Sequence, residues 1–179
     1  DAGQRCGDPV LMGRAYTLMT LEDGFAGRFQ HGIEHGEQAV ALLEQTTDSA
    51  WLGLALYYLG GPYWWSGRLL QALAVGRRLS RLGETLGDRR LQVHGLTHMG
   101  TMYTLLGACD AGIDVLQHAG VLSPDAFESA YTLGQLGHAY LEKGDRAQAI
   151  STLEQAVGAA QHYRSLQVQS WFHTYLSTA

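Results

Sequence analysis

The sequence predicts an all-α fold built from repeated αα-hairpins, and three observations support this prediction. Apolar residues recur at helical spacing along most of the chain, for example at Leu133, Leu136 and Tyr140, and no segment shows the strict alternation of a half-buried strand. One segment overlays another after a shift of 37 residues, which brings Gly100 onto Gly137. Glycine shortly before aspartate marks turns between the helical stretches. Each hairpin leaves an apolar face that only its neighbour can cover, so we expect the hairpins to stack.

The turn signals divide the chain into four predicted hairpins and part of a fifth. Asp8 before Pro9 and Ser123 before Pro124 are typical helix starts, because a capping side chain adjoins a proline at the first helical position. The chain starts with Asp1 and ends within a helical pattern, so we expect it to be a segment of a longer protein. Within one domain over residues 1–179, the predicted units are 8–46, 47–87, 88–122, 123–163 and a partial unit at 165–179.

The turns between the two helices of each hairpin are predicted to be unevenly spaced. The predicted turn glycines, separated by 33, 47 and 37 residues, are Gly27, Gly60, Gly107 and Gly144. The middle interval holds about 13 residues more than a repeat of about 34 residues requires. We place these extra residues in an elongated second helix over 68–86 and a long following helix over 88–106.

The best-defined unit contains Leu136, Gly137 and Tyr140, followed by Gly144 and Ala149. This spacing resembles the tetratricopeptide repeat (TPR). The resemblance implies a right-handed superhelix of αα-hairpins that recognises proteins or peptides, and it is strongest over residues 93–160. Small residues would let the two helices of a pair approach closely, and we assign this role to Gly53, Gly100 and Gly137.

The resemblance also implies a binding surface. In TPR proteins the first helix of each hairpin builds the concave face, which is the usual peptide groove. The positions that match this face hold no lysine, arginine or asparagine, so a clamp for a terminal carboxylate is not expected. The implied groove is neutral and rich in hydroxyl and aromatic groups, and this favours a partner segment with apolar anchors. The implied groove residues are Tyr57, Tyr58, His94, Thr97, Thr101, Thr104, Tyr131, His138 and Glu142.

The long predicted helices also resemble the repeat arrays of large bacterial signalling proteins, including multidomain transcriptional regulators and nucleotide cyclases. This likeness implies a regulatory segment, with a protein or peptide partner and self-association as a further option. A small-molecule sensor is the alternative, because aromatic side chains crowd one short stretch and can stack on a ligand. These aromatic residues are Trp51, Tyr57, Tyr58, Tyr63, Trp64 and Trp65.

Composition and charge exclude other partners. The formal net charge is −5, whereas nucleic-acid binding needs a basic stripe, so no nucleic-acid partner is expected. The longest uncharged stretch, 49–66, is interrupted at Gly60, Gly61 and Pro62 and cannot form the helix of about 20 residues that a bilayer requires. The only two cysteines lie far apart in sequence, which suits a reducing, cytoplasmic compartment.

Catalytic and metal motifs are sparse. His31, Glu34 and His35 match the H-x-x-E-H pattern of zinc peptidases, but no third ligand stands out, so we interpret them as solvated polar residues. His94 and His98 also lie four residues apart and could sense pH or bind a metal, although packing is the simpler interpretation. No phosphate-binding loop, nucleophile elbow or dinucleotide fingerprint occurs. We therefore expect no enzyme activity, no metal and no cofactor.

Overall fold

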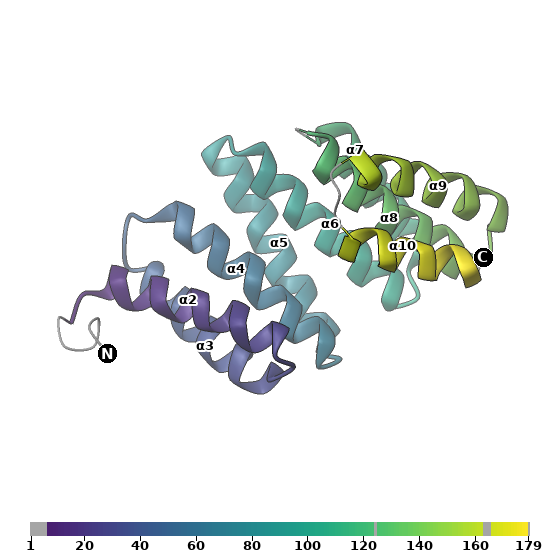
Figure 1. Cartoon of the computed structure of the whole chain (residues 1–179). Helices are drawn as coiled ribbons and strands as arrows, with labels where there is room; N and C mark the ends of the chain where they lie inside the picture. The colour runs from purple at the N-terminus through teal and green to yellow at the C-terminus, as the bar shows by residue number, and fades with distance from the viewer. Residues whose placement is uncertain (1–6, 124, 163–165, 179) are drawn as a thin grey trace.

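The computed structural model describes residues 7–123, 125–162 and 166–178. These residues form helices joined by short turns, and no strand occurs among them, so the all-α prediction is confirmed (Figure 1). The helices are α2 (Pro9–Phe25), α3 (Phe29–Leu43), α4 (Ser49–Trp65), α5 (Leu69–Leu86), α6 (Arg89–Leu105), α7 (Cys109–Leu122), α8 (Ala126–Lys143), α9 (Arg146–His162) and α10 (Leu166–Thr178).

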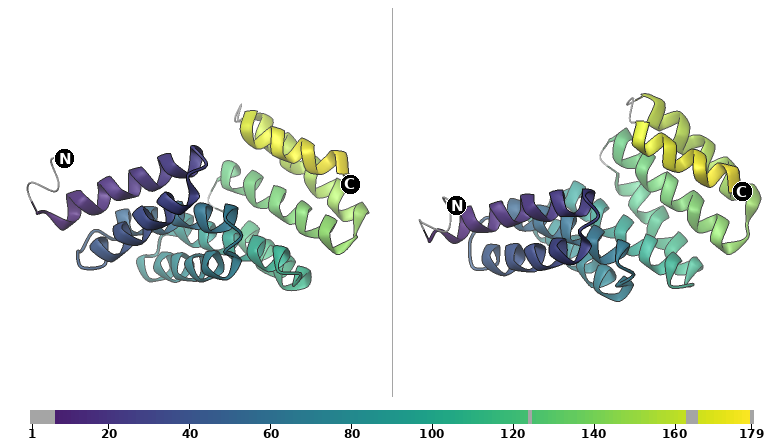
Figure 2. Two further views of the ribbon diagram at one scale, coloured as in Figure 1. Left: turned by 90° about the horizontal axis from the view of Figure 1, so that it is seen from below. Right: turned by 60° about the horizontal axis from the view of Figure 1, so that its bottom comes forward.

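The helices stack in two layers. The first helices of the pairs contact one another in order, α2 with α4, α4 with α6, and α6 with α8, while the second helices pack against them from the other side. The array curves, so that α2 at one end and α10 at the other rise on the same side (Figure 2). Helix α4 carries apolar residues around its whole circumference. This suits its position, since α2, α3, α5 and α6 all contact it. The inner layer therefore forms the concave face of the array.

Helices α2, α4, α6 and α8 each follow an aspartate whose side chain accepts hydrogen bonds from backbone amides of the first turn. Asp8 accepts from Val10 N, and the other three aspartates make equivalent bonds. Such caps satisfy amides that have no partner within the helix. The capping residues, 40, 40 and 37 residues apart, are Asp8, Asp48, Asp88 and Asp125.

The turn of the second hairpin lies at Gly67, and the predicted turn at Gly60 is wrong. Gly67 has a φ of 76°, a left-handed conformation that favours glycine, whereas Gly60 is buried inside α4. Gly27, Gly67 and Gly107 are thus 40 residues apart, and no insertion separates the second turn from the third. The shift of seven residues is close to two helical turns, so both alignments place apolar residues on the same face.

Backbone contact between hairpins occurs where α5 meets α6. A Cβ added at Gly95 would lie 2.7 Å from Ser80 Cα, and one added at Gly83 would lie 2.8 Å from Gln92 Cα. These distances are shorter than real Cβ contacts, so only glycine fits at either position. The second and third hairpins therefore touch through their main chains.

The expected close approach within a hairpin occurs at two of the three assigned glycines. An added Cβ at Gly100 would lie 3.0 Å from the Gly112 carbonyl oxygen of α7, and one at Gly137 would lie 2.6 Å from Leu153 Cγ of α9. Gly53 instead faces Leu91 of α6, which belongs to the next hairpin. Its assignment to the α4–α5 contact is therefore wrong.

Candidate binding groove on the concave face

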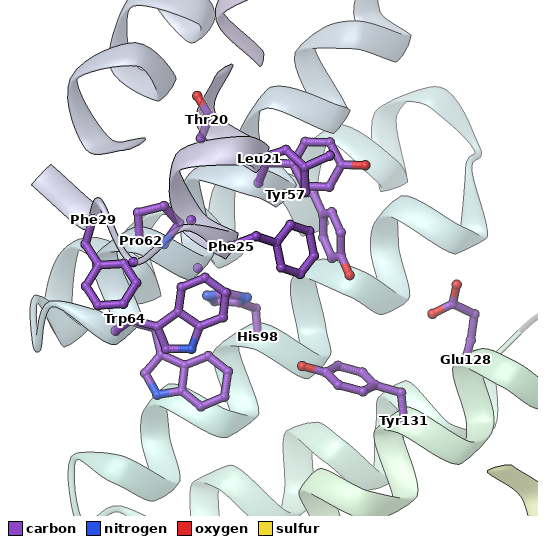
Figure 3. A pocket seen from close by; sticks show the side chains of 15 residues that line it. Thr20, Leu21, Phe25, Phe29, Tyr57, Pro62, Trp64, His98, Glu128 and Tyr131 are labelled. Carbon is purple, nitrogen blue, oxygen red and sulfur yellow. The ribbon is translucent and has the colours of Figure 1, made fainter. Parts of the chain in front are cut away.

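A cavity of about 470 Å³ opens on the concave face where four first helices converge. Its walls combine residues of α2, α4, α6 and α8 with Phe29 at the start of α3 (Figure 3). Segments more than 100 residues apart in sequence therefore meet at one site: Phe25 is on α2 and Tyr131 is on α8. Volumes of roughly 300–1,000 Å³ are typical of ligand pockets.

Aromatic side chains form most of the cavity wall. Phe25 is 70% exposed and Trp65 is 43% exposed, so both present apolar surface to solvent. Phe29 packs against Trp65 with ring centroids 5.6 Å apart. Contiguous exposed apolar surface is typical of interaction sites. The remaining aromatic wall residues are Tyr57, Tyr58, Trp64 and Tyr131.

A chain of contacts joins α4, α6 and α8 at one side of the cavity. The Tyr57 ring stacks on His94, with centroids 4.5 Å apart, and His94 Nε2 lies 2.8 Å from Glu128 Oε2. Burial, together with the negative charge of Glu128, raises the pKa of Tyr57 to about 12. Tyr57 is therefore neutral at physiological pH, and its position is fixed by the histidine beneath it.

The charged groups beside this chain are mainly acidic. Glu128 is buried, and Arg90 is the one lysine or arginine that pairs with it among the described residues, with Arg90 Nε 3.6 Å from Glu128 Oε1. Arg90 makes its shorter ion pair, 2.6 Å, with Asp125. The hydrogen bond and the charge of Asp125 raise the pKa of Arg90 most. The charge of Glu128 has a smaller effect in the same direction, and the charge of Asp88 has the smallest. Arg90 thus forms ion pairs with Asp125 and Glu128, and Asp88 adds a weaker charge effect.

His98 lies at the base of the cavity and its Nε2 atom is buried without a hydrogen-bond partner in the described part of the chain. It packs where α4 lacks a side chain: an added Cβ at Gly60 would lie 2.7 Å from His98 Nε2. Trp64 meets the ring edge-on, with centroids 6.4 Å apart. Burial lowers the pKa of His98 to about 4, although the Gly60 backbone opposes this effect. The imidazole is therefore neutral near pH 7.

Tyr131 reaches the cavity from α8. Its ring points toward the side where Phe25 and Trp64 lie (Figure 3). Burial raises its pKa, and the nearby Tyr57 adds to the effect. Among the described residues, no side-chain or backbone group hydrogen-bonds the hydroxyl of Tyr131, Tyr57 or Tyr58. These hydroxyls are available to a bound group.

The three threonines expected on the concave face are buried. Thr97 Oγ1 lies 3.0 Å from Thr132 Oγ1 of α8, and Thr101 Oγ1 bonds the carbonyl oxygen of Thr97 at 2.8 Å. Thr104 Oγ1 donates to the Gly100 carbonyl oxygen. All three are at most 4% exposed. Helix α8 covers Thr97 and Thr101, and helix α7 packs against Thr104. The threonines hold helices together and do not reach the groove surface.

His138 and Glu142 lie beyond the cavity, toward α10. His138 stacks on Tyr175 of α10 with centroids 4.5 Å apart, and its Nε2 lies 3.3 Å from Glu142 Oε1. Burial lowers the pKa of His138, and Glu142 opposes this shift. Glu142 itself is exposed. The expected groove residues therefore fall into a cavity group on α4, α6 and α8 and a separate group beside α10.

The histidines of the H-x-x-E-H pattern serve different purposes. His35 Nδ1 lies 2.7 Å from Asp23 Oδ2, and Arg28 donates to the other oxygen of this carboxylate at 2.6 Å. Burial raises the pKa of Asp23, but these two partners outweigh it and the net shift is downward. His31 is exposed. Among the residues that the structure describes, no three histidine, cysteine or carboxylate side chains converge as metal ligands would.

Sequence reasoning missed the contribution of α2 to the cavity. Thr20, Leu21 and Phe25 line it, together with Gly24. The signal in the sequence was Phe25, a large aromatic residue two positions before the turn glycine Gly27, where a solvent-exposed helix end is expected to carry polar residues.

Within the described ranges, no helix is long and apolar enough to cross a membrane.

The two-layer array is the fold of TPR-like repeat proteins, as expected. The chain is similar to the crystal structure of nearly identical TPR-like repeats from a Podosopora anserina protein described as a kinesin light chain. The TM-score is 0.68 at 17% identity, over 94% of this chain and 85% of that one. A single-substitution variant of those repeats gives a TM-score of 0.69 at 16% identity, over 94% and 84%. No family model matches the sequence, and no curated protein matches it either.

Proposed function

We propose that this chain is a protein-interaction scaffold that binds a peptide or an extended segment of a partner protein on its concave face. The observation that carries the proposal is the cavity of about 470 Å³ with exposed aromatic walls, built by four successive first helices. Aromatic anchors that pack in such pockets contribute most of the binding energy in protein interfaces. Tyr57, Tyr58, His94 and Tyr131 are the proposed contact residues at the cavity, and His138 and Glu142 are a separate proposed contact group beside α10.

A selection of random peptides on the purified chain tests this proposal. The affinity of each selected peptide is measured by fluorescence anisotropy for the wild type and for a Tyr58→Ala/Tyr131→Ala double variant. We expect the double variant to bind about tenfold or more weakly, since two wall residues are truncated. A Leu70→Ala/Val121→Ala variant is the matched control, because both side chains are exposed on second helices away from the cavity. Equal affinities for the wild type and the double variant would contradict the proposal.

A small-molecule sensor is the second candidate, because the same cavity is of ligand size and the aromatic residues near 51–65 supply its walls. Metabolites and peptides can be compared by thermal shift. A ligand present at about 100 times its Kd raises the free energy of unfolding by roughly 2.7 kcal/mol. Stabilisation by metabolites alone, abolished in the Tyr58→Ala/Tyr131→Ala variant, favours the sensor over the scaffold.

The wider setting is also a proposal. We infer a regulatory segment of a larger cytoplasmic signalling or transcription-regulating protein, without enzyme activity, cofactor or nucleic-acid partner of its own. The net charge of −5 and the interaction-type fold support this assignment. Self-association would be a further means of regulation, and sedimentation at several concentrations measures it.

A further inference from the structure

We propose that the cavity on the concave face receives a basic side chain of the bound segment, arginine in preference to lysine. This inference rests on the proposed function and adds the chemistry of the anchor. Three features of the cavity support it: the aromatic walls, the unpartnered acceptor atoms, and the acidic groups at one edge.

The aromatic walls suit a cation. Negative charge density on the faces of the wall rings attracts an ammonium or guanidinium group, and tryptophan does so most strongly. These rings are Phe25, Tyr57, Tyr58, Trp64, Trp65 and Tyr131. The residues that line the cavity include no lysine and no arginine. A cation that enters therefore meets no like charge on the walls.

The base of the cavity offers acceptors. His98 Nε2 is buried against Gly60 of α4 without a partner, and the hydroxyl of the partly buried Tyr131 has no hydrogen-bond partner within the described residues. A buried polar atom without a hydrogen bond is unusual in a folded protein and calls for a ligand or water. Guanidinium carries five N–H donors in a planar fork and stacks on aromatic rings, so it can serve several acceptors at once. The ammonium group has three donors and is more strongly hydrated than guanidinium, so its desolvation costs more and lysine is the weaker anchor.

The charge at the edge of the cavity is complementary to a cation. Glu128 lines the cavity, and Asp88 and Asp125 lie near it around Arg90. Three carboxylates, those of Asp88, Asp125 and Glu128, act on one guanidinium at this edge. Arg90 is held mainly by Asp125, at 2.6 Å against 3.6 Å to Glu128, so it only partly neutralises Glu128.

Other anchors fit this cavity less well. An aliphatic side chain would leave His98 Nε2 without a partner and would place apolar atoms beside the Glu128 carboxylate, which is unfavourable. An acidic side chain would be repelled by Glu128 and would find no cation on the walls. A basic anchor is the one class of side chain that satisfies both the acceptors and the charge.

The test uses peptides selected on the full chain, each resynthesised with citrulline, lysine or alanine in place of every arginine. Citrulline keeps the shape of arginine but has no charge. We expect one arginine per peptide whose citrulline variant binds about tenfold or more weakly, with lysine intermediate. In a Glu128→Gln variant, the preference for arginine over citrulline should shrink several-fold. Glu154→Gln, an exposed glutamate of α9, is the matched control and should leave the preference unchanged.

A second variant guards against misfolding of Glu128→Gln. Phe25→Leu keeps an apolar side chain at a position that is 70% exposed but removes the aromatic face, so folding is expected to be unaffected. It should weaken arginine peptides several-fold, whereas a purely apolar anchor would bind it equally well.

The outcomes separate this inference from the proposed function. Peptides that require Tyr58 and Tyr131 but tolerate citrulline everywhere would overturn the basic anchor and leave the scaffold standing. Failure to select any groove-binding peptide would overturn both. Equal affinity for N-acetyl-arginine amide and for the peptides would show that a free cation, and no peptide segment, is the ligand.

Discussion

A Gly95→Ala variant is expected to lose about 2 kcal/mol of unfolding free energy, because the new methyl group would collide with the backbone of α5. The added Cβ would lie 2.7 Å from Ser80 Cα and 2.8 Å from the Gly76 carbonyl oxygen. These are main-chain atoms of a neighbouring helix, so no side-chain rotation relieves the contact. The second and third hairpins must then separate, and each loses the apolar cover that stabilises a stacked array. Chemical denaturation followed by circular dichroism measures the change.

The matched control for this experiment is Gly158→Ala. Gly158 is also inside a helix, α9, but an added Cβ there would meet no atom within 4 Å apart from its chain neighbours and the nearby backbone of its own helix. Alanine at this position should stabilise the chain by about 0.5–1 kcal/mol, since it restricts the unfolded state and favours helix. If both variants changed stability alike, the backbone contact between α5 and α6 would not limit the fold.

The repeat pattern correctly predicted the close-packed glycines of the third and fourth hairpins, because these glycines contact a helix that is adjacent in the sequence. Gly100 and Gly137 each face the second helix of their own pair, as expected. The second hairpin was misaligned. Gly53, Gly60 and Gly67 are spaced at seven residues, close to two helical turns, so sequence alone does not distinguish which one closes the turn.

The site was predicted only in part, because its chemistry depends on contacts between distant segments. Tyr57, Tyr58 and Tyr131 line the cavity. The threonines of α6 were expected beside them, but α8 covers Thr97 and Thr101 with its own hydroxyl and amide groups. Sequence spacing indicates which face of a helix points inward, but it does not indicate how closely the next repeat approaches that face.

The environment of His98 illustrates the same limit. In the sequence, His98 is one of two histidines four residues apart, and either one could have faced solvent. Its burial follows from Gly60, which lies 38 positions earlier and leaves room on α4 for an imidazole ring. His94, one helical turn before it, instead contacts Glu128 on α8. Two chemically identical side chains thus differ because they meet different repeats.

This burial of His98 makes the stability of the chain depend on pH. The pKa of His98 is about 4 in the folded state, below its ordinary value of 6.5. Between these values the unfolded chain binds a proton that the folded chain does not, so the unfolding free energy falls as the pH falls from 6.5 to 4. The slope approaches about 1.4 kcal/mol per pH unit and the total loss is roughly 3 kcal/mol. Above pH 6.5 the contribution is complete.

Urea denaturation at pH 7, 6, 5 and 4.5 measures this dependence, and a His98→Phe variant identifies its source. Phenylalanine retains a planar ring in the space beside Gly60 but cannot titrate, so most of the slope should disappear. A smaller slope should remain, because burial also lowers the pKa of His138. The exposed His31 provides the control, and His31→Gln should keep the full wild-type slope. Identical slopes in the wild type and His98→Phe would mean that the imidazole takes up a proton without leaving the folded structure, and the cavity base would then be wet and open to ions.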